Sequence, residues 1–253
     1  MKKMSITITM LLIWVCGSIY AQTPAAEDIL KNADAVVNAP KDQEITLEMI
    51  LIDKKGKEKK RVAKMWQKGS EKRMIKFLLP ADVKGLGFLD LPDDIMYLYL
   101  PAFKKIRRIA SHVKNTSFAG TDFTYDDMAS INYTDEYDPK LIGTKKEKGL
   151  DHYLLELIPK KGIKKDYSKL VMWVRKDNFY PVKIEHYDKA GKLWKVMDRK
   201  WIKKEGKYWI AKEAKMTDLK KEHRTKMLII EVKFDQDLKD EFFSQRYLKR
   251  REK

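Results

Sequence analysis

The sequence predicts a mainly β fold, an antiparallel barrel or sandwich. Apolar and polar residues alternate with a period of two in one segment after another, as they do in a half-buried strand. Gly, Pro or Asp bounds these segments, and three stretches carry the period of a helix. A long series of strands joined by short turns, with few helices between them, is typical of an antiparallel sheet.

The first 21 residues have the pattern of a secretory signal peptide. Two lysines precede an apolar run over residues 6–15, which is shorter than the ~20 residues that a membrane-spanning helix needs. We place cleavage after Ala21, so that residues 22–253 form one mature, exported domain. Cys16 is the only cysteine and does not follow a small residue, so we expect neither lipidation nor a disulfide.

The chain is strongly basic. Its 54 Lys and Arg residues against 37 Asp and Glu residues give a formal net charge of +17. Such a charge suggests two partners, nucleic acid or the anionic surface of a membrane. Export argues against nucleic acid and leaves the membrane surface. Because the lysines are spread along nearly every segment, a solvated outer face of a sheet explains most of them.

An amphipathic helix is predicted to open the mature chain. Acidic residues follow Pro24, where they complement the helix dipole, and apolar residues recur from Ile29 to Val37. From Glu44 the period changes to two, and a turn at 53–57 joins two strands into a hairpin. The predicted strands cover residues 44–53, 60–68, 71–79, 85–91, 94–101, 104–109, 153–158, 170–175, 182–187, 192–203, 208–218 and 225–234.

Two further helices are predicted to interrupt the strands. The first covers 122–130 with Asp122 as its N-cap, and the second covers 237–249, where apolar residues recur on one side. The sequence shows no repeat of fixed period and no linker, which favours a single domain.

No residue pattern points to an enzyme. The histidines, His112, His152, His186 and His223, lie far apart and in no metal-ligand spacing, so we assign them structural or surface roles. Three adjacent carboxylate pairs suit turns and caps better than shared acid–base chemistry. Nucleophile elbows and phosphate-binding loops are missing from the sequence. We therefore predict no catalytic residue, no metal and no cofactor.

Some predicted strands are apolar on both faces. In 44–53 and 95–100, apolar residues occupy odd and even positions alike, so each face needs a cover. One face can pack on helices while the other lines a cavity suited to an acyl chain. Strand alternation selects the candidate lining residues: Ile45, Leu47, Met49, Leu51, Ile75, Phe77, Tyr97, Tyr99, Leu170 and Met172.

Eight short motifs stand in order along the chain. They are RMIKF at 73–77, PADVKG at 80–85, YLYLP at 97–101, RRI at 107–109, FAGTDFTY at 118–125, YPVKIEHYD at 180–188, GKLWK at 191–195 and FDQDL at 234–238. Together they resemble the LolA-like family of outer-membrane lipoprotein-sorting proteins. The ordered combination is far more specific than any one motif, and it covers almost all of the mature chain.

The resemblance implies a curved antiparallel sheet that forms an incomplete half-barrel. Helices would cover its concave face, with an apolar cavity between them. Members of the family carry acyl chains of lipoproteins or other lipids across the periplasm. The resemblance thus implies a periplasmic carrier whose partners are these acyl chains and an inner-membrane transporter.

The motif residues have plausible roles that need no catalysis. We expect the paired arginines to hold the predicted 122–130 helix against the sheet by pairing with Asp122 or Asp126; contact with a lipid phosphate is the alternative. The aromatic residues that follow would bury their rings beneath this helix, which we interpret as a hinged plug. The rim and plug candidates are Arg107, Arg108, Asp122, Phe123 and Tyr125.

Three functions compete at this level. The first is a carrier or chaperone that shields an acyl chain. The second is an envelope interaction module that binds a membrane transporter or senses envelope stress without taking up lipid. The third is a hydrolase, which would need clustered acids or histidines with perturbed pKa values.

Overall fold

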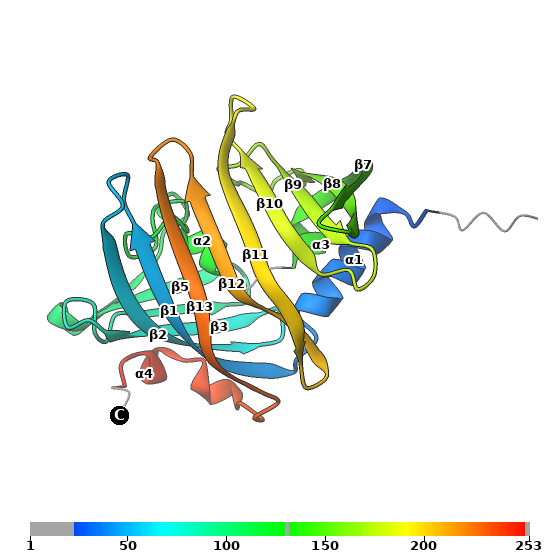
Figure 1. Ribbon diagram of the computed structural model, residues 1–253. Coiled ribbons are helices and arrows are strands. Elements are labelled where there is room, and N and C mark those ends of the chain that lie inside the picture. Colours follow the sequence, from blue (N-terminus) through cyan, green and yellow to red (C-terminus); the bar gives the residue numbers. More distant parts are fainter. Residues whose placement is uncertain (1–22, 130–131, 251–253) are drawn as a thin grey trace, which may run out of the picture.

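One antiparallel sheet of 13 strands dominates the computed structural model, which describes residues 23–129 and 132–250 (Figure 1). The strand order is β6-β5-β4-β3-β2-β1-β13-β12-β11-β10-β9-β8-β7, so β6 and β7 are the two edges of an open sheet. The predicted signal peptide lies outside the described residues. The mainly β, half-barrel fold predicted from the sequence and the resemblance is confirmed.

The strands follow one another as hairpins, with a single exception. Neighbours in the sheet are neighbours in sequence, except where β1 pairs with β13 and joins the two halves. The strands are β1 Asp42–Ile52, β2 Glu58–Lys68, β3 Lys72–Leu79, β4 Gly87–Leu91, β5 Ile95–Leu100, β6 Lys105–Arg108, β7 Tyr137–Glu147, β8 Leu150–Pro159, β9 Lys169–Arg175, β10 Pro181–Tyr187, β11 Leu193–Glu205, β12 Tyr208–Asp218 and β13 His223–Phe234.

Helices lie on both sides of the curved sheet. The helices α1 (Ala26–Val37), α2 (Tyr125–Met128) and α3 (Tyr133–Glu136) are on the concave side, whereas α4 (Gln245–Leu248) lies outside, beneath β2 and β3 (Figure 1). Short 3₁₀ turns occur at η1 (Pro101–Phe103) and η2 (Asp240–Phe242). The concave side therefore holds the main core, and the outer side is covered only locally.

A second, smaller core forms under the C-terminal segment. Trp66, Met74 and Leu89 on the convex face are buried against Phe243 and Leu248. Lys76, which is also buried, donates through Nζ to the carbonyls of Tyr247 and Arg250, at 2.6 and 2.9 Å. The Tyr247 carbonyl lies in the last turn of α4 and the Arg250 carbonyl just beyond it, where a cation complements the helix dipole.

The structure corrects two predictions for the helices. The segment 237–249 forms two short helical turns because Ser244 has an extended backbone and caps α4 by accepting the Tyr247 N–H. The predicted helix at 122–130 is only α2, and its N-cap is Thr124, not Asp122. Thr124 and Asp127 form a reciprocal capping box, a pattern that fixes the helix start.

Strand β7 is missing from the predicted strands. It carries Pro139 and a bulge between Leu141 and Gly143, and its second half is mostly charged. These are features of an edge strand, where half of the backbone groups need no partner strand. They erase the period-two pattern on which the prediction depended.

Candidate lipid-binding face and its plug

The concave face of the sheet is a continuous apolar surface, and strands from both halves of the sheet contribute side chains to it. Eight of the ten predicted lining residues lie in this one cluster, each at most 5% exposed: Ile45, Leu47, Met49, Leu51, Ile75, Phe77, Leu170 and Met172. Pairing across the sheet places Ile45 beside Met65 and Val232, and Met172 beside Leu155 and Ile184. Strand alternation therefore assigned the correct face in β1, β3 and β9.

Tyr97 and Tyr99 lie on the opposite face. They pack with the convex cluster around Trp66, while Met96 and Leu98 of the same strand face the main core. The register with β4 sets this choice, because Leu98 pairs with Phe88. Strand β5 is apolar at every position, so alternation could not decide its face, and an error of one residue inverts the assignment.

Residues 110–129, which we call the plug segment, cover the concave face beside β3 and β4. Phe118 is fully buried, and its ring centroid lies 5.7 Å from Phe77, 5.6 Å from Phe88 and 5.5 Å from Tyr125. Phe123 and Met128 are buried in the same cluster. Side chains of the plug segment thus occupy the space that the sequence analysis assigned to an apolar cavity.

The tip of the plug segment depends on two residues with left-handed backbone. Ala119 and Gly120 have φ values of 50° and 76°, and together they reverse the chain so that Phe118 N–H bonds to the Phe123 carbonyl. The Arg61 guanidinium donates to the Ala119 carbonyl from β2. Burial lowers the pKa of Arg61, which still remains a cation at physiological pH.

Asp122 fastens the plug segment to β13. Its carboxylate lies 2.7 Å from Nδ1 of His223 and accepts the Thr225 hydroxyl at 2.7 Å, and its backbone N–H donates to the same hydroxyl. Its carbonyl accepts a bond of 2.8 Å from Lys195 Nζ. We call Asp122, His223 and Thr225 the latch. The latch replaces the cap that the sequence predicted for Asp122.

The buried side chain of Lys195 lies next to the latch. Lys195 is 3% exposed, and its Nζ lies 3.9 Å from the Asp127 carboxylate, which also accepts the Tyr167 hydroxyl at 3.1 Å. Burial lowers the pKa of Lys195 against the opposing effect of Asp127. Burial and Asp127 together raise the pKa of Tyr167 well above its usual value. Tyr167 therefore stays neutral, and its hydroxyl donates a hydrogen bond to the Asp127 carboxylate.

Arg73 fixes the far end of the plug segment. Its Nη1 donates to the carbonyls of Met128 and Ala129 at 3.0 and 2.7 Å, and Gln67 orients the guanidinium. Burial lowers its pKa to about 10. Lys195, Arg61 and Arg73 were not among the predicted site residues, because cations on strands look like solvated positions in sequence.

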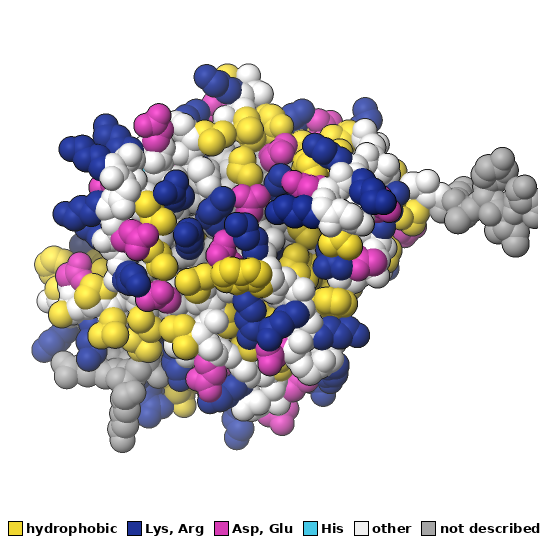
Figure 2. All heavy atoms as spheres, in the orientation of Figure 1, with side chains coloured by type: hydrophobic (Ala, Val, Ile, Leu, Met, Phe, Trp, Pro, Cys, Tyr) yellow, Lys and Arg dark blue, Asp and Glu magenta, His cyan; other side chains and the backbone are white. Residues whose placement is uncertain are grey.

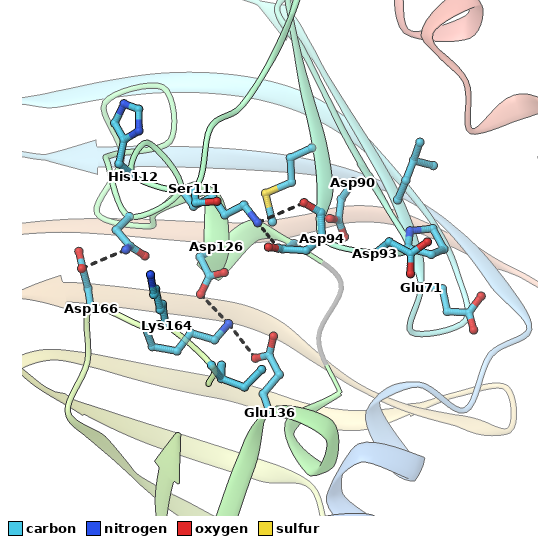
Figure 3. Close-up of a pocket in the computed structure, with 18 of the residues that line it drawn as sticks. Glu71, Asp90, Asp93, Asp94, Ser111, His112, Asp126, Glu136, Lys164 and Asp166 are labelled. Atoms are coloured by element: carbon cyan, nitrogen blue, oxygen red, sulfur yellow. Dashed lines mark hydrogen bonds and ion pairs between the residues drawn. The ribbon is translucent and has the colours of Figure 1, made fainter. Parts of the chain in front are cut away.

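A polar pocket of about 950 Å³ opens next to the plug segment (Figure 3). It lies between the ends of β4 and β5, α2, and the 160–168 loop. Lys165 occupies one wall, with Nζ 2.8 Å from both Asp126 and Glu136, and Lys114 on the other side pairs with Asp94. Burial raises the pKa of Asp126 and of Glu136, and the Lys165 ammonium group between them opposes this shift.

The two arginines that were expected to hold the plug are elsewhere. Arg107 and Arg108 are exposed on the edge strand β6, where they pair in register with Leu98 and Tyr97. Their expected partners are taken: Asp122 bonds to His223 and Thr225, and Asp126 bonds to Lys165. The predicted pairing of these arginines with Asp122 or Asp126 is therefore wrong.

The histidines occupy unrelated places. His223 belongs to the latch, His112 lines the polar pocket, and His152 and His186 are buried on different strands. Across residues 23–129 and 132–250, no group of three or more His, Cys, Asp or Glu side chains is placed to hold a metal ion. In the same part of the chain, no helix has the length and apolarity to cross a membrane.

Solved structures show the same architecture over nearly the whole chain. A domain from Vibrio parahaemolyticus, provisionally named an outer membrane lipoprotein-sorting protein, is 30% identical over 89% of this chain and 100% of its own, with a TM-score of 0.81. A LolA superfamily protein from Nitrosomonas europaea is 22% identical over 89% of this chain and 100% of its own, with a TM-score of 0.75, and shows the fold. The fold class is thus LolA-like.

The family follows from closer matches. A DUF1329 family protein from Desulfovibrio piger is 30% identical over 88% of this chain and 97% of its own, with a TM-score of 0.83. A family model described as an uncharacterized protein matches residues 69–250. The chain belongs to this DUF1329 family, within the LolA-like outer-membrane lipoprotein-sorting group. No curated protein matches the chain.

Proposed function

We propose that this protein is a non-enzymatic periplasmic carrier or chaperone that shields acyl chains of a lipid or lipoprotein on its concave face. The plug segment covers that face in the ligand-free state, and an acyl chain takes its place during transport. An inner-membrane transporter is the expected donor. The relatives named for lipoprotein sorting support this function at the level of the fold.

The main support for the proposal is that the apolar face belongs to a regular sheet, whereas the segment that covers it has little secondary structure. The concave face extends over strands from both halves of the sheet, yet beside β3 and β4 its cover has only one short helix, α2. Burying one methylene of an acyl chain contributes about 0.8 kcal/mol. A long acyl chain can therefore compensate for the loss of the contacts made by Phe118 and its neighbours.

The cover is also attached in a manner that permits release. Polar contacts of Asp122, Arg61 and Arg73 hold the plug segment at its tip and its end. Each is a hydrogen bond or ion pair of a charged group, whose net contribution is about 1.5–3 kcal/mol. Such contacts can be exchanged for contacts with solvent or a partner more readily than an extended core can be unpacked.

Labelling with a photoreactive fatty acid tests the proposal directly. Three methionines, all 0% exposed, provide an internal comparison: Met49 and Met172 face the concave cluster, whereas Met74 faces the convex one. We expect cross-links on peptides that contain Met49 and Met172 but not on the peptide with Met74. Native mass spectrometry should show lipid bound to protein purified from its own envelope. Absence of lipid together with labelling of Met74 alone would contradict the carrier.

A second candidate is an interaction module that takes up no lipid. It is favoured by the filled concave face, since Phe118, Phe123 and Tyr125 already pack there. The module would bind a transporter or a stress-sensing partner through its outer surface. Release of the latch by substitution discriminates between the two functions, because only a carrier gains acyl-chain binding when the plug segment is loosened.

A further inference from the structure

Four turns at one end of the sheet are rich in lysine, and we call them the lysine rim. They are 53–57, 160–168, 188–192 and 219–222, which connect β1 to β2, β8 to β9, β10 to β11 and β12 to β13. The rim holds 11 lysines and 4 acidic residues. The segments at the opposite ends of the same strands, 38–41, 69–71, 148–149, 176–180, 206–207 and 235–237, hold 4 lysines and 4 acidic residues.

Contacts between the turns make the lysine rim one continuous surface. Lys220 pairs with Asp188 at 2.5 Å and connects the last two turns. Lys189 Nζ donates to the Lys165 carbonyl at 2.5 Å and connects 188–192 to 160–168. At the other side, Ile52 pairs with Arg224, so the turns 53–57 and 219–222 lie side by side at the ends of β1 and β13.

Most of the positive charge on this surface is free to bind a partner. Six rim lysines are exposed and make no ion pair or side-chain hydrogen bond within the described chain: Lys54, Lys55, Lys57, Lys161, Lys164 and Lys192. Figure 2 shows Lys and Arg side chains at the tips of the β1–β2 and β10–β11 turns. The free lysines therefore belong to several turns and face solvent together.

Two of the four acidic residues of the rim, Asp53 and Asp188, bond to backbone N–H groups of their own turns. Asp53 accepts the backbone N–H groups of Lys55 and Lys57, each at 2.9 Å. Asp188 accepts the N–H groups of Ala190 and Lys192 in the same way. The N–H groups of its turn lower the pKa of Asp53, and the Lys220 ammonium followed by the N–H groups of its turn lowers the pKa of Asp188. The backbone bonds direct both carboxylates into their turns. The surface consequently presents ammonium groups outward.

The convex face of the sheet is different, although it also carries many lysines. There the lysines pair with acids across neighbouring strands, as in Lys64–Glu44 at 2.9 Å and Lys215–Asp198 at 3.1 Å. Such pairs neutralise one another and give no net field. The rim, by contrast, carries a formal charge of +7 of the chain's +17 on its four turns.

The rim also presents apolar side chains. Leu219 is 46% exposed and Ile163 is 41% exposed, each beside free or loosely paired lysines. Two aliphatic side chains among ammonium groups are complementary to a partner that has a charged outer layer and an apolar interior directly beneath it. An acidic protein surface would satisfy the lysines but would leave these side chains without apolar contacts.

We propose that the lysine rim docks on the surface of an anionic lipid bilayer. The lysines contact the headgroup phosphates, while Leu219 and Ile163 enter the interface between headgroups and acyl chains. Docking in this orientation brings the latch to the membrane, because His223 immediately follows one of the rim turns. The rim binds the bilayer whether or not the concave face takes up an acyl chain, so the two proposals are tested separately.

Vesicle sedimentation of the full chain tests the rim with matched variants. The rim variant is Lys55→Glu with Lys192→Glu, and the control is Lys148→Glu with Lys239→Glu, which changes net charge equally outside the rim. We expect binding to vesicles that contain phosphatidylglycerol and little binding to pure phosphatidylcholine. Because each lysine near an anionic surface contributes about fivefold, the rim variant should lose more than about tenfold in affinity. The control should keep its affinity within about twofold.

A second pair of variants tests the apolar contacts. Leu219→Ser should weaken binding to the same vesicles, and Ile230→Ser should not, although Ile230 on the convex face is 62% exposed. Circular dichroism of each variant confirms that it is folded. Three results would each contradict docking of the rim on a bilayer. They are equal binding by the rim and control variants, equal binding to both lipids, and no binding to any vesicle.

Discussion

The Asp122 carboxylate and the His223 imidazole meet at 2.7 Å, although 101 residues separate them in sequence. Asp122 is buried in the plug segment, whereas His223 opens β13 at the mouth of the half-barrel and is partly exposed. Thr225, on the same face of β13, completes the arrangement. One side-chain cluster therefore links the irregular cover of the concave face to the central strands of the sheet.

Replacing Thr225 with Val should loosen the plug segment selectively. Valine keeps the shape of the side chain but removes the hydroxyl that bonds to both the carboxylate and the N–H of Asp122. Leaving these buried groups without that partner costs about 1–3 kcal/mol. Hydrogen exchange should accelerate at residues 118–124 and stay slow in β1 and β12.

The matched control is Thr217→Val. Thr217 lies on the neighbouring strand β12, pairs with Arg224 and has no side-chain hydrogen bond in the described chain. It should leave exchange of the plug segment unchanged. Equal protection of 118–124 and the central strands in the Thr225 variant, with or without lipid, would contradict a plug that opens on its own.

Acid should destabilise the protein through His186. This residue is buried with its ring centroid 4.7 Å from that of Tyr167, and burial lowers its pKa to about 4. In the unfolded chain this imidazole binds a proton near pH 6.5, whereas in the folded chain it does not until about pH 4. The folded protein therefore loses stability as pH falls from 6.5 to about 4. The full difference corresponds to about 3 kcal/mol.

Urea unfolding at pH 7 and pH 4.5 measures this effect. His186→Phe keeps a ring against Tyr167 and cannot be protonated, so it should lose less stability between the two pH values than the unmodified chain. His112→Phe changes an exposed histidine and should leave the pH dependence as it is. A His186 variant with an unaltered pH slope would show that burial of this imidazole does not control acid stability.

Gly87 and Leu248 should show strong coupling in a double-mutant cycle. A Cβ at position 87 would lie 2.7 Å from Leu248 Cδ1, which is closer than carbon atoms pack. Gly87→Ala should therefore displace the buried Leu248 side chain and cost about 1–3 kcal/mol. Leu248→Ala alone leaves a cavity in the convex core and costs about 2–5 kcal/mol.

Chemical denaturation of the four proteins supplies the cycle. In the double variant the new methyl group enters space that the leucine vacated, so the combined loss should be smaller than the sum of the two single losses. Additive losses would mean that Gly87 is required for a reason other than contact with the C-terminal segment.

The sequence predicted the elements of this fold better than the connections between them. Period-two alternation placed Met49 and Ile75 on the concave face, where the polar neighbours Glu48 and Lys76 mark the other face. Met172 lies on the concave face as well, although β9 is apolar over 170–174 and alternation alone does not define its faces. The same reasoning failed for Tyr97 and Tyr99, since β5 is apolar throughout and pairing with β4 decides its face. Register between strands is a long-range property that local alternation does not contain.

The plug was anticipated in its location but not in its attachment. The motif at 118–125 correctly drew attention to Phe123 and Tyr125, which are buried as aromatic anchors. Its contacts, however, come from Lys195, His223 and Thr225, which lie 70 or more residues away. Arginines near the motif in sequence were chosen instead. Partners that meet only after 13 strands have paired leave no local signal.

Removing the charge of Lys165 should destabilise the protein more than any change at its exposed neighbour. Lys165 Nζ contacts Asp126 and Glu136 at 2.8 Å, and its side chain is 5% exposed. Lys165→Met leaves two partly buried carboxylates without a counter-charge, for which a loss of about 3 kcal/mol is typical. Lys164→Met, an exposed position on the same loop, should change the free energy of unfolding by less than about 0.5 kcal/mol.

The loss in the Lys165 variant should also depend on pH. Burial already raises the pKa of Asp126 and Glu136, and removal of the ammonium group raises both further. For a carboxyl whose folded pKa is raised, the folded state binds the extra proton, so stability increases as pH falls through that pKa. Urea unfolding at pH 7 and pH 5 should show a deficit that shrinks at the lower pH. A deficit that stays constant would mean that lost packing of the lysine chain, and not its charge, accounts for the effect.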